Sequence, residues 1–267
     1  MLNILFIGDI SGKIGRKTIA EIVPKLKKDL KLDLVIANAE NAAHGSGVTE
    51  DSLKELMEAG IDYFTSGDHA FDRIKQAEAC YGNLPIVRPA NFPPDVPGKG
   101  FAVISTKKGD ILLINLIGRA FMQADFDCPF RKFEEILISP DLAGKKLSAI
   151  IIDIHAEATA EKITLAHYVD GRASAVLGTH THVATADERI TAKGTACITD
   201  VGMVGAADEC IGVQKDNIIK TSLTQIKYPH ILPENGRAIF NSVILKINEK
   251  TGEVKSIKRI EKFINIK

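Results

Sequence analysis

The five residues Gly178-Thr179-His180-Thr181-His182 follow an apolar run at 173–177, and the rest of the chain is interpreted from them. The apolar run is typical of a buried strand. Side chains on extended backbone repeat every second residue, so the two imidazoles are expected to point in about the same direction. Such a pair can ligate one metal with both rings, or give one ring to each of two metals. An isolated pair is more often part of a surface loop, so the interpretation depends on how the other strands end.

Length and composition fit a globular protein that does not bind nucleic acid or an anionic membrane through its overall charge. The chain has 267 residues, 45% of them apolar, which is enough for one large domain over residues 1–267. The 34 basic and 34 acidic side chains cancel, so no overall field attracts nucleic acid or an anionic membrane. We therefore expect no stable nucleic-acid complex and no membrane partner.

The cysteines and the N-terminus indicate the compartment. The four cysteines form no C-x-x-C pair, so we expect reduced thiols in a cytoplasmic protein. The apolar start of the chain is interrupted by Asp9, which favours a first strand over a signal peptide. No apolar stretch approaches the roughly 20 residues that span a bilayer.

Strands and amphipathic helices alternate in the first part of the chain. The pattern predicts strands at 2–7, 34–37 and 62–66, with helices at 19–30 and from Thr49 onward. Thr49 is a helix N-cap candidate, and Leu53, Leu56 and Met57 are expected to face the core. This alternation is typical of βαβ units and a parallel sheet.

The remainder of the chain mixes hairpins with further strand–helix pairs. The proline-rich segment 88–94 fits neither a helix nor a central strand. Residues 119–147 are predicted to form a loop and a helix. Their role is either a lid or a contact between copies of the chain, and the sequence does not decide between the two. The predicted elements are a hairpin of 101–106 with 111–117, strands at 148–154 and 195–199, helices at 159–169 and 218–226, and a closing hairpin of 240–247 with 253–260.

Five predicted strands end in side chains that ligate metals. Functional groups gather outside the carboxyl ends of strands in α/β sheets, so these side chains are expected to converge. Carboxylate oxygens together with imidazole nitrogens favour Fe, Mn or Zn over Mg or Ca. So many ligands suit two metals about 3.5–4 Å apart with one bridging carboxylate. The side chains are Asp9, Glu40, Asn41, Asp68, His69, His155, His180 and His182.

The other histidines are weaker candidates. His44 lies in a glycine-rich loop, from which a side chain can reach a substrate. His167 falls inside a predicted helix and His230 follows a Tyr-Pro pair, so we interpret both as structural or surface residues.

The ordered set of ligands resembles the calcineurin-type metallophosphoesterases. Their pattern is an early Asp, then GD, GNH, a lone His and GHxH; here an acid, Glu40, takes the place of the second aspartate. Longer strings are similar to the YmdB-like subfamily of bacterial di-metal phosphodiesterases, and the similarity runs over nearly the whole chain. These strings begin at Ala39 (AENAAHG), Arg88 (RPANFP), Ile154 (IHAEAT) and Thr199 (TDVGM).

The resemblance implies an α/β fold with a four-layer α/β/β/α sandwich and a di-metal centre. The metals would be divalent or mixed-valence transition-metal ions, iron in the first place, with manganese or zinc as alternatives. The implied activity is hydrolysis of 2′,3′-cyclic nucleotides, small-molecule substrates, to 3′-nucleotides. Carried over by position, Asp9, Glu40, Asn41 and His182 would hold one metal, while Glu40 as bridge, Asp68, His155 and His180 would hold the other.

His69 would act as the general acid in this reaction. The metals would ionise a water whose hydroxide attacks phosphorus in line, and His69 would protonate the departing ribose oxygen. Arg88 and Arg119 are candidates for clamping the phosphate or the nucleotide.

Asp68 departs from the family pattern, which has asparagine before the catalytic histidine. An aspartate still ligates through oxygen, and its extra negative charge should raise metal affinity and oppose an anionic substrate. It should also favour the protonated form of His69, as an acid requires.

Four other functions share some of these features. A di-metal phosphomonoesterase or a broad-specificity phosphodiesterase would use the same ligands. A metal-binding regulatory protein with little catalysis would also keep them. A zinc amidohydrolase barrel has its H-x-H at the first strand, whereas this chain opens with Asp9. A homo-oligomer is left open.

Overall fold

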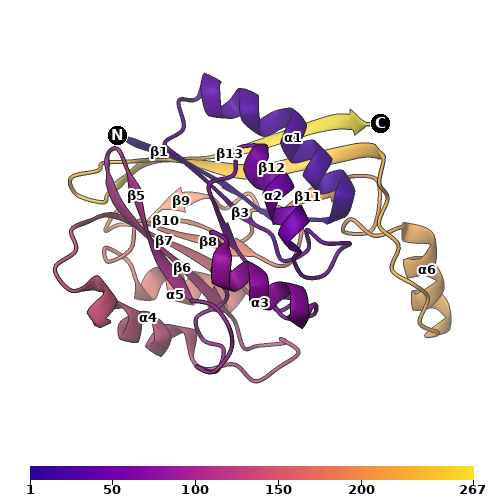
Figure 1. Cartoon of the computed structure of the whole chain (residues 1–267), viewed down its shortest axis with the longest axis horizontal. Coiled ribbons are helices and arrows are strands. Elements are labelled where there is room, and N and C mark those ends of the chain that lie inside the picture. The colour runs from indigo at the N-terminus through magenta and orange to yellow at the C-terminus, as the bar shows by residue number, and fades with distance from the viewer.

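Two β-sheets pack face to face, and helices cover the outer face of each (Figure 1). The computed structural model describes residues 1–267. The predicted α/β/β/α sandwich is confirmed, and with two open sheets the alternative of an amidohydrolase barrel is wrong.

The first sheet has seven strands in the order β2-β11-β12-β1-β3-β4, with β13 paired to β12. Parallel pairing joins β1 to β3 and β3 to β4, as the βαβ pattern predicted. The closing hairpin adds β12 antiparallel to β1, so the sheet is mixed. Its strands are β1 (Leu2–Ile7), β2 (Asp9–Ile10), β3 (Leu34–Asn38), β4 (Tyr63–Thr65), β11 (Met203–Ala206), β12 (Gly236–Ile247) and β13 (Val254–Ile266).

The second sheet has six strands in the order β5-β6-β7-β8-β10-β9. The predicted antiparallel hairpin of β5 and β6 is confirmed, β6, β7, β8 and β10 run parallel to one another, and β9 pairs antiparallel with β10. Its strands are β5 (Phe101–Thr106), β6 (Gly109–Ile117), β7 (Leu147–His155), β8 (Ala175–Thr179), β9 (Arg189–Ile190) and β10 (Ala196–Ile198).

Three apolar layers hold the sandwich together. Alternate residues of β1 serve two of them: Leu5 and Ile7 pack under the helices, whereas Ile4 and Phe6 face the second sheet. The third layer lies between the second sheet and the helices α4 and α5. The helices are α1 (Gly12–Asp29), α2 (Glu50–Glu58), α3 (Ile74–Asn83), α4 (Pro129–Leu137), α5 (Thr159–Tyr168) and α6 (Lys215–Thr224), with a 3-10 turn at Pro140–Leu142.

Local predictions on the helices hold in part. Thr49 caps α2 as predicted, because its hydroxyl accepts from Ser52 N at 3.2 Å. Met57 was predicted to face the core, but it is 37% exposed, since Leu53 and Leu56 already fill the inner face of α2. Helix α3 was not predicted, because few of its residues are aliphatic and only Ala77, Cys80 and Tyr81 are buried.

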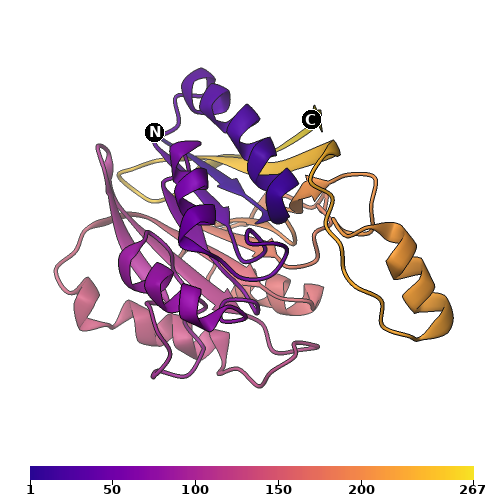
Figure 2. The same cartoon turned by 45° about the vertical axis from the view of Figure 1, so that its right-hand side comes forward.

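Helix α6 stands away from both sheets (Figure 2). The apolar residues of 218–226 predicted a helix, and α6 spans Lys215–Thr224. However, no residue of α6 is buried, Leu223 is 79% exposed and Ile226 lies beyond the helix end. No helix in the structure combines the length and apolar character needed to cross a membrane.

The layer between the sheets should carry much of the stability. We predict that Phe6→Ala lowers the free energy of unfolding by about 3–5 kcal/mol, because Phe6 is fully buried there. Phe263→Ala is the matched control, since Phe263 is half-exposed and the Arg237 guanidinium lies over its ring at 4.3 Å. The control should cost about 1 kcal/mol or less in urea denaturation. Equal losses would contradict this account of the core.

Candidate metal centre

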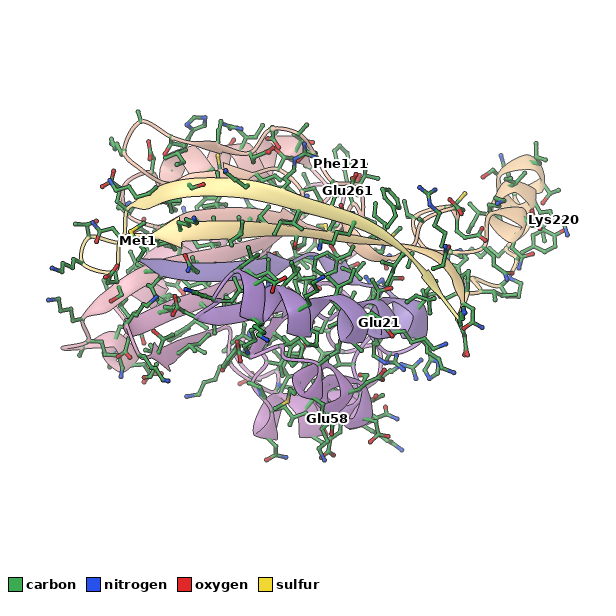
Figure 3. The ribbon with its side chains drawn as sticks, turned by 90° about the horizontal axis from the view of Figure 1, so that it is seen from above. Met1, Glu21, Glu58, Phe121, Lys220 and Glu261 are labelled. Carbon is green, nitrogen blue, oxygen red and sulfur yellow. The ribbon has the colours of Figure 1, made fainter.

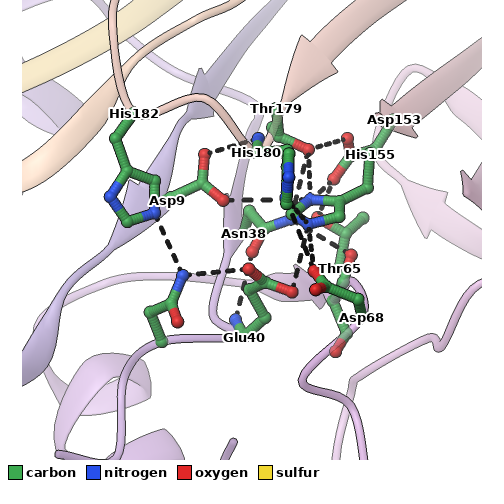
Figure 4. A network of polar contacts seen from close by, with 12 residues as sticks. Asp9, Asn38, Glu40, Thr65, Asp68, Asp153, His155, Thr179, His180 and His182 are labelled. Carbon is green, nitrogen blue, oxygen red and sulfur yellow. Dashed lines mark hydrogen bonds and ion pairs between the residues drawn. The ribbon is translucent and has the colours of Figure 1, made fainter. Parts of the chain in front are cut away.

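The carboxyl ends of parallel strands from both sheets meet at one edge of the sandwich. Asp9 lies in β2 directly after β1, while Glu40 and Asp68 follow β3 and β4. From the second sheet, His155 ends β7 and His180 follows β8. The structure brings these five side chains together with His182, although they span most of the chain (Figure 4).

The acidic and histidine side chains fall into two groups. Glu40, Asp68, His155 and His180 form one, and Asp9, Glu40 and His182 form the other; within each group the donor atoms lie within 4.8 Å of one another. Glu40 belongs to both, which is the position of a bridging carboxylate. The division is the one that the family resemblance implies, and the residues cluster as a candidate di-metal site.

His155 directs a ring nitrogen into the first group. Its Nε2 lies 2.9 Å from Asp68 Oδ1, 3.0 Å from His180 Nδ1 and 3.2 Å from Glu40 Oε2. On the other side of the ring, Nδ1 contacts Thr179 Oγ1 at 2.9 Å, and that hydroxyl donates to Asp153 Oδ1 at 2.7 Å. Because the Thr179 proton is used on Asp153, Nδ1–H of His155 is the donor, and Nε2 is left for a cation.

The charge balance of this group favours a cation. Burial disfavours a charged imidazole, but Glu40, Asp68 and Asp9 outweigh it and raise the pKa of His155 well above its usual range. For Asp68, burial is outweighed by His155 and His180, and the pKa of its carboxyl is lowered. The Asp68 carboxyl therefore favours its ionised form, and its negative charge beside Glu40 attracts either a proton or a metal ion.

His180 and His182 point to different groups, and one premise of the sequence analysis is wrong. The backbone is not extended here, because His180 has φ of 104° and His182 has φ of 65°. The ring of His180 contacts Asp68 through Nδ1 at 3.4 Å and Glu157 through Nε2 at 3.3 Å. His182 Nδ1 donates to the Ile211 carbonyl at 3.0 Å, which leaves its Nε2 for the second group.

Asp9 supplies the observation that tests whether a metal fits. The residue is fully buried, and its Oδ2 accepts from His180 N at 3.2 Å. Its Oδ1 has no hydrogen-bond partner, and burial raises the pKa of this carboxyl. A buried carboxylate oxygen without a partner is costly, and a metal ion beside it removes that cost. The donor set and this oxygen therefore fit transition-metal ions.

Asn41 lies in the cluster, but its side chain directs the amide nitrogen, and not the oxygen that would ligate a metal, toward the other ligands. Nδ2 is 2.9 Å from Glu40 Oε1 and 3.1 Å from His182 Nε2. Ligation by Asn41 requires its side-chain amide to be turned so that oxygen replaces nitrogen at this position. The orientation of an amide follows from the donors and acceptors around it.

His69 stands beside the cluster with one ring nitrogen free. Its backbone N donates to Glu40 Oε2 at 3.3 Å, and its Nδ1 pairs with Asp72 at 2.8 Å. The side chain is 33% exposed, so Nε2 is open to a ligand. Burial lowers its pKa, but Glu40, Asp68 and Asp72 outweigh burial and raise it, in the direction expected from Asp68. Asp72 was missed, although its place three residues after the histidine is a recognisable signal.

Two buried carboxylates that support the ligands were also missed. Asp153 bonds Thr65, Thr179 and Asn38 beneath the cluster, and burial raises its pKa to about 7. It is the one acidic residue of β7 and interrupts a run of isoleucines, and that interruption was the available signal.

Asp200 holds the H-x-H loop from a neighbouring strand end. It forms a buried ion pair with Lys162 at 2.8 Å and accepts from the N of Thr181, the residue between the two histidines, at 3.1 Å. The string around Asp200 contributed to the family resemblance, but only the structure gives it a role.

The two candidate arginines differ. All three guanidinium nitrogens of Arg88 donate to carbonyls of Pro89, Val96 and Pro97, so the prediction of a phosphate clamp does not fit Arg88. Arg119 is exposed, and its guanidinium makes no hydrogen bond or ion pair.

The three weaker histidine candidates, His44, His167 and His230, are all exposed.

Comparisons with known proteins agree with this geometry. A family model described as YmdB-like protein matches residues 5–260. The 2′,3′-cyclic-nucleotide 2′-phosphodiesterase of Bacillus subtilis (strain 168) is 44% identical, over 97% of this chain and 96% of that protein. A solved structure titled as a novel phosphatase of Mycoplasma pneumoniae is 32% identical with a TM-score of 0.91, over 99% of this chain and 94% of that one. A hypothetical protein from Thermus thermophilus is 38% identical with a TM-score of 0.90, over 98% of this chain and 99% of that one.

Gly67 gives a direct test of the cluster. A Cβ at this position would lie 2.0 Å from Glu40 Oε2 and 2.3 Å from His155 Nε2, so Gly67→Ala must displace both side chains. We predict that the variant binds Mn²⁺ at least about ten-fold more weakly than the unchanged protein, measured by equilibrium dialysis.

The matched control is Gly82→Ala in α3, where a Cβ meets nothing within 4 Å. It should bind metal normally and gain about 0.5–1 kcal/mol of stability from the better helix former. Unchanged metal affinity in a folded Gly67→Ala protein would show that the cluster is not the metal site.

Proposed function

This chain belongs to the YmdB-like family, and we propose that it is a metal-dependent phosphodiesterase that hydrolyses 2′,3′-cyclic nucleotides to 3′-nucleotides. The observation that carries the proposal is the pair of ligand groups sharing Glu40, with His69 beside them and its Nε2 free. The Bacillus subtilis relative bears the name of this activity.

The proposed ligands are those of the two groups. Asp9, Glu40, Asn41 and His182 hold one metal, and Glu40, Asp68, His155 and His180 hold the other. When bound there, two divalent or mixed-valence transition-metal ions, iron first and manganese or zinc as alternatives, would supply Lewis-acid activation of a water and offset the phosphate charge. Imidazole and carboxylate donors together suit these metals better than magnesium or calcium.

His69 is the proposed general acid. Hydrolysis breaks the bond between phosphorus and O2′, so O2′ must gain a proton while the phosphate stays on O3′. Asp72 holds Nδ1 of His69 at 2.8 Å, which orients Nε2 as the atom that donates this proton. The negative charge of Asp68 favours the protonated ring, and it also opposes the anionic substrate.

We further propose that residues 1–267 act as one domain in the bacterial cytoplasm. The two sheets share an apolar layer and both contribute to the cluster, which supports one domain. Four free cysteines suit a reducing compartment.

The ligands themselves do not recognise a base, so a phosphomonoesterase and a broad-specificity phosphodiesterase share this centre, and a relative is described as a phosphatase. Release of inorganic phosphate from 3′-AMP would indicate the first, and equal turnover of acyclic diesters would indicate the second. Bound metal without any turnover would indicate a regulatory protein.

Hydrolysis of 2′,3′-cyclic AMP tests the proposal. We expect the metal-loaded protein to release 3′-AMP, and His69→Ala to lower kcat by about 10²–10⁴-fold while both metals stay bound. The products are separated by chromatography, which distinguishes 3′-AMP from 2′-AMP.

His167→Ala is the matched control, because His167 is an exposed histidine of α5 outside the cluster. It should retain full activity. The proposal fails if the protein with two metals bound releases no product, or if His69→Ala is as active as the control.

A further inference from the structure

The loop between β6 and α4, residues 118–127, begins where β6 ends, beside the end of the neighbouring strand β7, which carries His155. Gly118 N donates to the His155 carbonyl at 2.9 Å. The next two amides, of Arg119 and Ala120, both donate to the Glu161 carboxylate at 2.9 Å. Glu161 lies in the first turn of α5, which follows His155 in the chain. The start of the loop is therefore fixed next to the first ligand group.

One buried side chain closes the loop. Asn91 is fully buried, and its amide donates to the carbonyls of Ile117 at 2.7 Å and Asp127 at 2.8 Å. Its oxygen accepts from Ile117 N at 2.9 Å. Both ends of the loop are thus held by the same amide, and residues 118–126 have a defined place.

Aromatic contacts tie the end of the loop to the segment of the proposed acid. The ring of Phe126 packs on Phe92 with centroids 4.8 Å apart, and Phe92 packs on Phe71 at 5.4 Å. Phe71 follows His69 by two residues. The loop therefore runs from the His155 side of the centre to the His69 side.

Phe121 occupies an unfavourable conformation at the tip of this loop. Met122 N bonds to the Arg119 carbonyl at 3.4 Å, and Phe121, the third residue of that turn, has φ of 64°. Such a position favours glycine, and a bulky residue is held there at a cost. The side chain is nonetheless 86% exposed (Figure 3 labels it), so packing does not explain the residue.

Strain in an exposed aromatic residue at the functional edge indicates a ligand. Phe121 lies three positions after Gly118, so their Cα atoms lie within about 11 Å of each other. Arg119, in the same turn, offers a guanidinium without a partner. An aromatic face and a free cation beside a phosphoryl site match the base and the charge of a nucleotide.

Resting on the proposed function, we propose that Phe121 is the surface on which the base of the cyclic nucleotide stacks, with Arg119 contacting the substrate's negative charge. A π face accepts every base, and a larger base gives more overlap. The site should therefore turn over all four 2′,3′-cyclic nucleotides and bind the purines more tightly.

The test compares 2′,3′-cyclic AMP with methyl riboside 2,3-cyclic phosphate, which carries the same reacting ring and no base. The preference for cyclic AMP, taken as the ratio of the two kcat/KM values, should fall by about 10-fold in Phe121→Ala. Phe121→Trp should keep the preference, because it keeps the stacking surface. The dissociation constant of 3′-AMP, measured by titration calorimetry, should rise by a similar factor in Phe121→Ala.

Ile138→Ala is the matched control, since Ile138 is another exposed apolar residue, at the end of α4. Ile138→Ala should change neither the preference for cyclic AMP nor the dissociation constant of 3′-AMP. An unchanged preference in Phe121→Ala, or a changed oligomeric state with the preference intact, would overturn the proposal. Failure of the unchanged protein to hydrolyse either substrate would instead overturn the phosphodiesterase function, so the two failures are distinguishable.

Discussion

The structure depends on buried negative charge that needs a cation. Asp9, Glu40 and Asp68 place carboxylates where both sheets end, and Asp9 Oδ1 has no hydrogen-bond partner in the protein. His155 and His182 direct their Nε2 atoms into the two groups that share Glu40, and the Nδ1 atoms of both rings are already bonded, His155 to Thr179 and His182 to the Ile211 carbonyl. Lone pairs that converge in this way repel one another in the absence of a proton or a metal ion. A metal centre explains the arrangement without further assumptions.

The fold supplies what this centre requires. Parallel strands bring ligands from residues 9 to 182 to one edge, and a second layer of buried polar groups fixes them. Asp153 supports His155 through the Thr179 hydroxyl, and the Asp200–Lys162 pair holds the backbone of the H-x-H loop. These supports tie the shape of the centre to the packing of both sheets, because their partners come from separate strands. The loop 118–127 is attached to the same edge, because it starts at the His155 carbonyl and ends at the aromatic rings next to the segment of His69.

Most of the fold and the cluster could be predicted from the sequence, because each ligand follows an apolar run that reads as a strand. The conformation of the H-x-H loop could not, since the positive φ values of His180 and His182 depend on Asp200, which is close only in the folded chain. Arg88 was a candidate for binding phosphate, but its guanidinium N–H groups donate to backbone carbonyls of its own loop. Met57 and the apolar residues of α6 show that helical periodicity identifies an apolar face without showing whether anything covers it. The assignment of each ligand to a metal stays a prediction.

The number and coupling of bound ions test the central claim most directly. Metal-free protein is titrated with Mn²⁺ while bound ions are counted and the electron paramagnetic resonance spectrum is recorded. A centre bridged by Glu40 predicts two ions per chain and a spectrum of two exchange-coupled ions, with the coupling lost in Glu40→Ala. One ion per chain, or two ions with the spectra of isolated Mn²⁺, would contradict a shared di-metal centre.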